Sequence, residues 1–172
     1  HILRLIEVME VITLKKEANI EHLETVVSLI RNFADGLHHN KEEKILFPKM
    51  AEKGFSFQQG PIAVMMHEHE LGRTYVKGMA EGITKYKDGE YNVIADIYKN
   101  MQAYIELLRA HISKENNILF RMADNAFSDE EQQKMLAEFG RVEQNPVCGG
   151  FVNDCIRQID ALALVYNALY KH

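Results

Sequence analysis

Two segments of this chain place a histidine four residues before a glutamate, and each segment then continues into the same Ile-Leu-Phe triplet. The pairs are His38 with Glu42 and His111 with Glu115. On a helix, residues four apart lie on one face, so each pair directs an imidazole and a carboxylate toward the same point. The chain is therefore expected to bring two helices face to face around a polar centre.

A helical period runs through the whole sequence. Apolar residues recur at three-and-four spacing from one end to the other, and the alternation typical of strands is nowhere sustained. Residues 54–60 form a glycine-bounded loop, and Pro61 suits the first turn of a helix. The expected long helices span residues 1–16, 19–53, 61–89 and 91–125.

The C-terminal part predicts two more helices. Ser128-Asp129-Glu130-Glu131 is a helix-capping signature, which opens a helix to about Val142. Asn145-Pro146 and Gly149-Gly150 predict a break, and a last helix is expected from Phe151 to Tyr170. The fold class is thus all-α: an up-and-down antiparallel four-helix bundle with two additional C-terminal helices on its outside. We expect a single domain over 1–172, with the bundle in 1–125 and the helical extension in 126–172.

Composition narrows the range of partners. A chain of 172 residues is one domain by length, and its formal net charge of −5 disfavours nucleic acid and acidic membranes as partners. No apolar run approaches the ~18 residues that a membrane span needs. Cys148 and Cys155 are expected to be small core residues in a reducing cytoplasm. Because the chain opens on His1 rather than Met, a native start, together with any targeting segment there, is expected to lie upstream.

Two histidine–glutamate pairs compete in the second helix, because His39 and Glu43 have the same spacing as His38 and Glu42. Helical steps back from His38 meet apolar residues, whereas steps back from His39 meet polar residues. We therefore expect His38 and Glu42 to face the bundle interior and His39 and Glu43 to face solvent.

The same test sorts the other histidines. His69 shares its stripe with apolar residues and His67 does not, while His111 and His1 both lie on apolar stripes of their helices. Arg73 and Tyr104 are expected either to line the site or to serve in ordinary packing. The predicted inward ligands are His1, His38, Glu42, His69, His111 and Glu115. The histidines assigned to the surface are His22, His39, His67 and His172.

Two inward carboxylates point to a cation. A buried carboxylate costs several kcal/mol unless it is paired or bound to a metal, although buried His–Glu hydrogen bonds without metal are an alternative. Four imidazoles and two carboxylates suit two non-heme iron ions, with zinc or manganese as the less favoured metals. If Glu42 and Glu115 both bridge, positions remain for an oxo or hydroxo bridge and for a small external ligand. Ferritin-like bundles use Glu-x-x-His instead, which argues against that class.

The ordered set His, His-x-x-x-Glu, His, His-x-x-x-Glu resembles the hemerythrin-like, HHE cation-binding family over residues 1–125. The resemblance rests on His1, His38 to Pro48, Glu68 to Arg73, and His111 to Phe120. It implies an up-and-down four-helix bundle with a di-iron centre that binds O2 or NO, and it implies the same six ligands. Oxygen-carrying members have a further histidine four residues from that of the third helix, where this chain has Met65 and Arg73. The ligand set is instead similar to that of the iron-sulfur-cluster repair proteins.

Two roles stay open at this point. The first is a binding protein that takes O2 or NO in sensing or stress response, with a redox or signalling protein as partner. The alternative is a di-iron enzyme that reduces NO or peroxide or supports iron-sulfur cluster repair. A third interpretation is a metal-storage or structural bundle that holds zinc or no metal.

Overall fold

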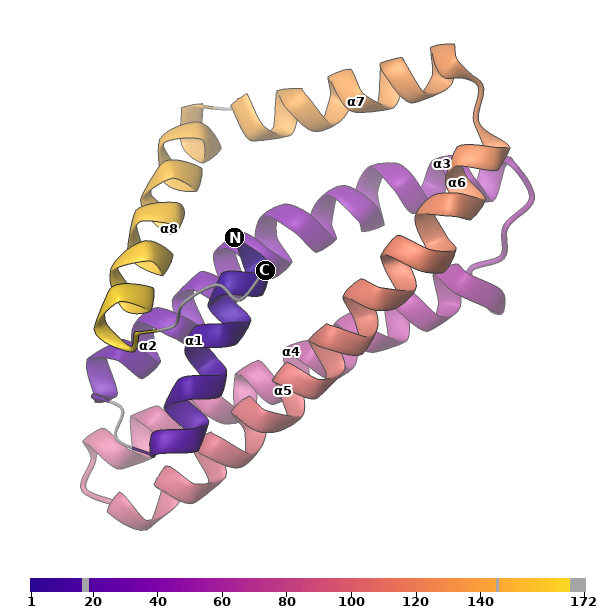
Figure 1. Ribbon diagram of the computed structural model, residues 1–172. Coiled ribbons are helices and arrows are strands. Elements are labelled where there is room, and N and C mark those ends of the chain that lie inside the picture. Colours follow the sequence, from indigo (N-terminus) through magenta and orange to yellow (C-terminus); the bar gives the residue numbers. More distant parts are fainter. Residues whose placement is uncertain (17–18, 145, 168–172) are drawn as a thin grey trace.

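The computed structural model describes residues 1–16, 19–144 and 146–167. For residue 144 and residues 146–150 it describes the backbone but not the side chains. Within these ranges every regular element is a helix, and the first four long helices alternate in direction (Figure 1). The prediction of an all-α bundle is confirmed. The helical segments are α1 (Ile2–Lys15), α2 (Ile20–Leu29), η1 (Ile30–His39), η2 (Glu42–Leu46), α3 (Phe47–Glu52), α4 (Gly60–Lys87), η3 (Tyr91–Val93), α5 (Ile94–Lys114), η4 (Glu115–Leu119), α6 (Phe120–Ala126), α7 (Asp129–Gln144) and α8 (Pro146–Val165).

Several of these segments join into longer helices. The run from α2 to α3 is one continuous helix, which we call the second bundle helix, and the run from α5 to α6 is the fourth bundle helix. Each contains turns of π-helix, in which a backbone N–H bonds the carbonyl five residues earlier: η1 and η2 in the second, η4 in the fourth. The predicted bounds of the four bundle helices agree with these within a few residues.

Local capping explains where helices begin. The Asn19 side chain accepts a hydrogen bond from the backbone N–H of Glu21 at 2.8 Å, which fixes the start of α2. At α7 the backbone N–H of Ser128 donates to the Glu131 carboxylate at 2.9 Å, and the Glu131 N–H donates to the Ser128 hydroxyl at 3.3 Å. This reciprocal pair is a capping box, as the sequence predicted.

The last helix begins earlier than predicted. It starts at Pro146, which suits a first turn, and passes through Gly149-Gly150 without a break. The expected start at Phe151 was therefore wrong, and the expected end at Tyr170 lies outside the described residues. Cys155 is buried and unpaired in this helix, as expected of a core cysteine. The Cys148 side chain lies outside the described part of the structure.

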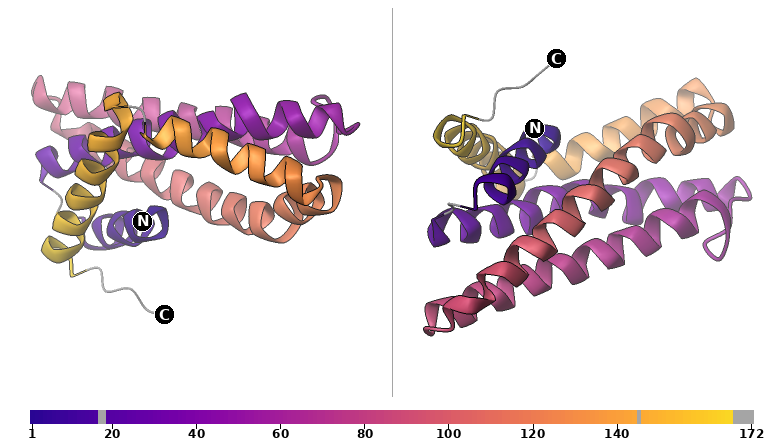
Figure 2. Two further views of the ribbon diagram at one scale, coloured as in Figure 1. Left: turned by 90° about the horizontal axis from the view of Figure 1, so that it is seen from above. Right: turned by 60° about the horizontal axis from the view of Figure 1, so that its bottom comes forward.

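Two apolar cores fill the bundle. The larger core joins α1, α2, α4 and α5 with α8, and the smaller core joins the far ends of the bundle helices with α7. The C-terminal helices supply buried residues to both: Ile159 of α8 is fully buried in the larger core, and Met135 of α7 is buried in the smaller one. Figure 2 shows α8 beside α1 and α7 along the second bundle helix. These helices therefore complete the two cores rather than only covering the bundle.

Ion pairs hold α7 along the second bundle helix. Lys49 Nζ donates to Glu138 at 2.9 Å, Lys53 Nζ donates to Glu131 at 2.7 Å, and Lys41 pairs with Glu143. These pairs are partly exposed and each contributes little by itself, so the apolar contacts of the smaller core carry most of the attachment. Among the described residues, no helix is both long enough and apolar enough to cross a membrane.

The close approach of α4 and α5 gives a stability prediction. A Cβ at Gly82 would lie 2.6 Å from Ile97 Cγ1, so we expect Gly82→Ala to lower the free energy of unfolding by about 1–3 kcal/mol. Gly140 of α7 has no atom within 4 Å of its Cβ position, and Gly140→Ala is expected to raise stability by up to ~1 kcal/mol. Urea unfolding measures both changes, and a stable Gly82→Ala protein would contradict the packing described.

Candidate metal centre

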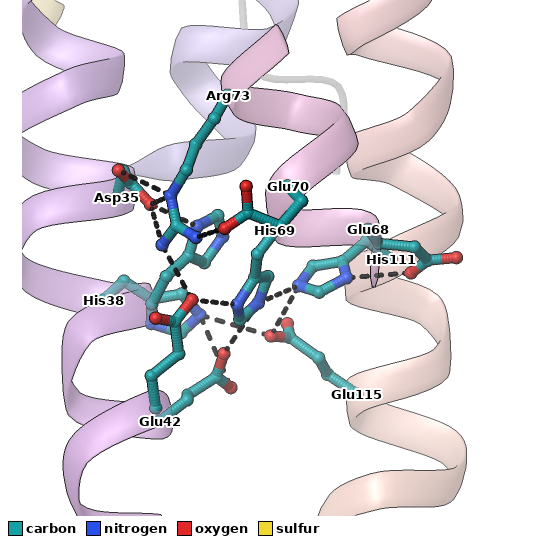
Figure 3. Close-up of polar contacts among 11 residues, drawn as sticks. Asp35, His38, Glu42, Glu68, His69, Glu70, Arg73, His111 and Glu115 are labelled. Atoms are coloured by element: carbon teal, nitrogen blue, oxygen red, sulfur yellow. Dashed lines mark hydrogen bonds and ion pairs between the residues drawn. The ribbon is translucent and has the colours of Figure 1, made fainter. Parts of the chain in front are cut away.

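A group of buried polar side chains lies between the two cores. These side chains come from the second bundle helix, α4 and the fourth bundle helix (Figure 3). Apart from tyrosines and Cys155, no other buried residue in the described part of the chain has a polar or charged side chain. The group consists of His39, Glu42, His69, His111 and Glu115, with exposed fractions between 2% and 6%.

The polar atoms of this group converge. His69 Nε2 lies 3.3 Å from Glu42 Oε2, and His111 Nε2 lies 3.1 Å from Glu115 Oε1. The two Nε2 atoms of His69 and His111 face each other at 3.2 Å. His38 approaches from the side, with Nε2 3.4 Å from Glu115 Oε1 and 3.9 Å from Glu42 Oε1. Five of the six predicted ligands therefore meet, although their binding of metal stays a prediction.

A carboxylate holds the outer nitrogen of each buried imidazole. Glu43 lies 2.7 Å from His69 Nδ1, and Glu68 lies 2.9 Å from His111 Nδ1. The third pair joins His39 Nδ1 to Asp35 at 3.3 Å. An Nδ1–H that donates to a carboxylate fixes the tautomer and turns Nε2 toward the centre, which is the usual second-layer arrangement of metal-binding histidines.

Cations at the periphery balance these outer carboxylates. Arg73 donates to Asp35 at 3.0 Å, to Glu43 at 2.7 Å and to Glu70 at 2.6 Å (Figure 3). Lys114 pairs with Glu68 at 2.6 Å on the opposite side. Arg73 thereby fixes the acceptors of two imidazoles at once. Although burial opposes it, contact with His39 and Arg73 lowers the pKa of Asp35 to about 2, so this carboxyl is ionised.

The two central carboxyls titrate very differently. Burial, reinforced by the nearby Glu115 charge, raises the pKa of Glu42 to about 8. Burial acts in the same direction on Glu115, but its contacts with His111 and His38 outweigh it and lower the pKa of Glu115. In the absence of a cation, Glu42 therefore favours its protonated form and Glu115 its ionised form, as expected of two carboxyls in one buried site.

The imidazoles differ as well. Burial lowers the pKa of His39 to about 4 and also lowers the pKa of His69, so both rings are neutral and can offer a lone pair. For His111, burial is outweighed by contacts with Glu115 and Glu68, and its pKa is raised. A proton on His111 Nε2 would lie between the two facing nitrogens, where a cation would also bind.

The donor set fits a metal ion. Both carboxylate oxygens of Glu42, one oxygen of Glu115 and Nε2 of His39 are buried without a hydrogen-bond partner in the described structure. Donor atoms of Glu42, His69, His111 and Glu115 lie within 4.8 Å of one another, and His39 forms a second such group with His69 and His111. Unpaired buried oxygens are costly, and a shared cation removes that cost.

His39 is a buried residue of this group that helical periodicity did not predict. It was expected on the surface, but it is 6% exposed and its ring stacks on His69 with centroids 3.9 Å apart. The reason is the π-helix η1, in which a turn takes more residues than in an α-helix, so the buried stripe steps from Ala34 to His39. His38 lies at the edge of the group in consequence, and its side chain is 33% exposed.

The π-turns follow the repeated sequence motif. η2 begins at Glu42 and ends at Leu46, and η4 begins at Glu115 and ends at Leu119. Each widened turn therefore starts at a central glutamate and ends within an Ile-Leu-Phe triplet. Such π-turns are frequent at functional sites. The duplicated Glu-x-x-Ile-Leu pattern was the available signal for them.

The other histidines lie outside the group. His1 is exposed, and its ring lies edge-on to Phe33 with centroids 6.5 Å apart, so the structure does not bring this predicted ligand to the centre. His67 is exposed, as expected. His22 is half-buried and its Nδ1 lies 2.8 Å from the Tyr166 hydroxyl. His172 lies outside the described residues.

Comparison with known proteins agrees with this geometry. The model of the hemerythrin HHE cation binding domain matches residues 1–123. The chain belongs to this family. It is accordingly a hemerythrin-like metal-binding domain, and the expected resemblance is confirmed. No solved structure matches the chain.

Curated relatives cover part of the chain. The iron-sulfur cluster repair protein YtfE of Pectobacterium carotovorum subsp. carotovorum (strain PC1) is 37% identical over 89 residues, which are 50% of this chain and 40% of that protein. The protein of the same name from Yersinia pestis (strain Pestoides F) is 39% identical over 90 residues, with the same coverage. The match thus spans less than half the length of these relatives.

Glu42 gives the metal-free protein a pH-dependent weakness. Its pKa rises from 4.5 to about 8 on folding, so the folded state loses stability as the pH rises through this interval. We expect Glu42→Gln to stabilise the metal-free protein by on the order of 2 kcal/mol at pH 8, and by little at pH 4.5. Glu81→Gln, at an exposed site on α4, is the control. Parallel stability curves for parent and Glu42→Gln between these pH values would refute the burial argument.

Proposed function

We propose that the centre holds two non-heme iron ions and binds O2 or NO. The observation that carries this proposal is a pair of buried glutamates with unpartnered oxygens that face several imidazole nitrogens. The proposed ligands that converge are His38, Glu42, His69, His111 and Glu115. Iron bound here supplies the capacity to bind and reduce small oxygen or nitrogen species.

The chain's own residues prepare the site for such metals. The outer carboxylates of Glu43 and Glu68 orient His69 and His111, and two glutamates offset part of the charge of a metal pair. The apolar cores on either side keep bulk water away from the centre, which strengthens every electrostatic interaction within it. These properties support a reactive rather than a purely structural metal site.

Two roles fit this centre. The first role is binding and sensing in stress response. The metals bind the external ligand, and a signalling or redox protein in the cytoplasm responds to whether the ligand is bound. The second candidate is catalytic: reduction of NO or peroxide, or support of iron-sulfur cluster repair. The name of these relatives, iron-sulfur cluster repair protein, favours this second candidate, although the match covers 40% of their length.

Metal content tests the proposal. We expect about two iron ions per chain in the parent and almost none in Glu42→Ala/Glu115→Ala, because both carboxylates lie at the meeting point of the imidazoles. His67→Ala removes an exposed histidine two residues from His69 and should keep the full content. Elemental analysis with an optical spectrum in air measures this. A zinc-loaded or metal-free parent would contradict the di-iron proposal.

His1 offers a sharper test of the ligand set. Its side chain is exposed and lies against Phe33, so His1→Ala should cost much less iron than His111→Ala, which removes a nitrogen from the middle of the group. Iron retention during dialysis against a chelator compares the two variants. Equal loss from both would mean that the first helix shifts to bring His1 to the metals.

Turnover separates the two roles. A binding protein should take up NO or peroxide stoichiometrically, whereas an enzyme should consume a large excess when a chemical reductant is supplied. Consumption by the iron-loaded parent is compared with that by the metal-free parent. Stoichiometric uptake alone would exclude the reduction of NO or peroxide as the function.

A further inference from the structure

A cavity of about 120 Å³ lies against the metal centre, between the second bundle helix, α4 and α5. His39 and His69 belong both to its wall and to the converging group, so the cavity borders the centre directly. An apolar cavity of ~150 Å³ can hold benzene, so this space suits a ligand of only a few heavy atoms. The residues that line the cavity include Asp35, His39, His69, Gly72, Arg73 and Tyr104.

Tyr104 lines this cavity with an unpaired hydroxyl. The residue is 2% exposed, and its hydroxyl oxygen is buried without a hydrogen-bond partner in the described structure. Burial also raises the pKa of Tyr104, so the hydroxyl keeps its proton and remains a donor. A buried hydroxyl without a partner destabilises a fold, and phenylalanine would fill the same volume without that cost.

Gly72 keeps the space beside Tyr104 open. A Cβ at this position would lie 3.4 Å from Cε2 of the Tyr104 ring and 3.7 Å from Leu107. Glycine in the interior of a helix such as α4 is less favourable than alanine. Gly72, which is unfavourable in a helix interior, therefore lies where a larger side chain would narrow the cavity.

The outer side of the cavity is formed by the ion pair of Arg73 with Asp35. Both side chains are about one-third exposed, at 32% and 31%, so they reach from the cavity to the solvent. Arg73 is tied to the carboxylates of Asp35, Glu43 and Glu70, which fixes its position and offsets its positive charge at this entrance. This ion pair therefore marks the side from which a small ligand can enter the cavity.

We propose that the Tyr104 hydroxyl donates a hydrogen bond to a small ligand that this cavity holds next to the metals. The inference rests on the proposed function, since the ligand binds beside the proposed metals. It adds the side from which the ligand enters, the size limit and the donor. Tyr104 is thus a ligand-binding residue, and Gly72 sets the room available.

Azide is the probe for this pocket, titrated into the oxidised iron-loaded protein and followed by absorbance. Tyr104→Phe should weaken azide binding about tenfold, the loss expected for one hydrogen bond to a charged ligand. Gly72→Ala should also weaken it because the added methyl group enters the cavity. Both variants should keep the parental iron content. Tyr98→Phe, in the larger core on the same helix, is the matched control and should bind azide like the parent.

A second measurement needs no metal. Since the Tyr104 hydroxyl has no partner in the protein, Tyr104→Phe should raise the Tm of the metal-free protein by about 2–4 °C. A lowered Tm would show that a bound water already pairs the hydroxyl, and would overturn its role as a free donor. Parental azide affinity in Tyr104→Phe and Gly72→Ala at full iron content would overturn the pocket alone. A parent without iron would overturn the proposed function, and the ligand pocket with it.

Discussion

Two carboxylates buried opposite each other are the constraint on which this molecule depends. Glu42 and Glu115 are 3% and 2% exposed, and neither could remain ionised there without compensation. The compensation is layered: imidazoles face the glutamates, carboxylates hold the imidazoles, and Arg73 and Lys114 hold those carboxylates. Each layer is polar and directional. The apolar cores on either side then keep the layers in register, because neither core can shift without disturbing its packing.

Helical periodicity predicted most of this arrangement. The bounds of the four bundle helices and the inward faces of Glu42, His69, His111 and Glu115 follow from the spacing of apolar residues. The same reasoning failed at His39, because it assumed a constant number of residues per turn. The π-helix η1 lies outside the repeated Glu-x-x-Ile-Leu motif, and the apolar pattern of the helix does not indicate its wider turn. His1 was misplaced for a related reason, since periodicity gives a face but not a distance.

The C-terminal helices show a second limit of sequence reasoning. The capping box at Ser128 predicted where α7 begins, because capping is a local interaction. The contribution of α7 and α8 to the cores could not be predicted in the same way, since it depends on which surfaces the bundle leaves uncovered. The sequence around buried residues such as Met135 and Ile159 does not indicate which bundle helices they pack against. The break predicted at Gly149-Gly150 was wrong because the surrounding helix α8 overrides the local preference of the two glycines.

The widened turns of the second bundle helix have a consequence for its two adjacent histidines. His38 and His39 sit at the end of η1, one ring partly outside and the other stacked on His69. A change from five-residue to four-residue hydrogen bonding over this segment would rotate the helix surface by about one residue. The rotation would also turn the residues beyond this segment, including Glu42, away from their present face. The register of these π-turns therefore decides together where both imidazoles and the central glutamate of this helix point.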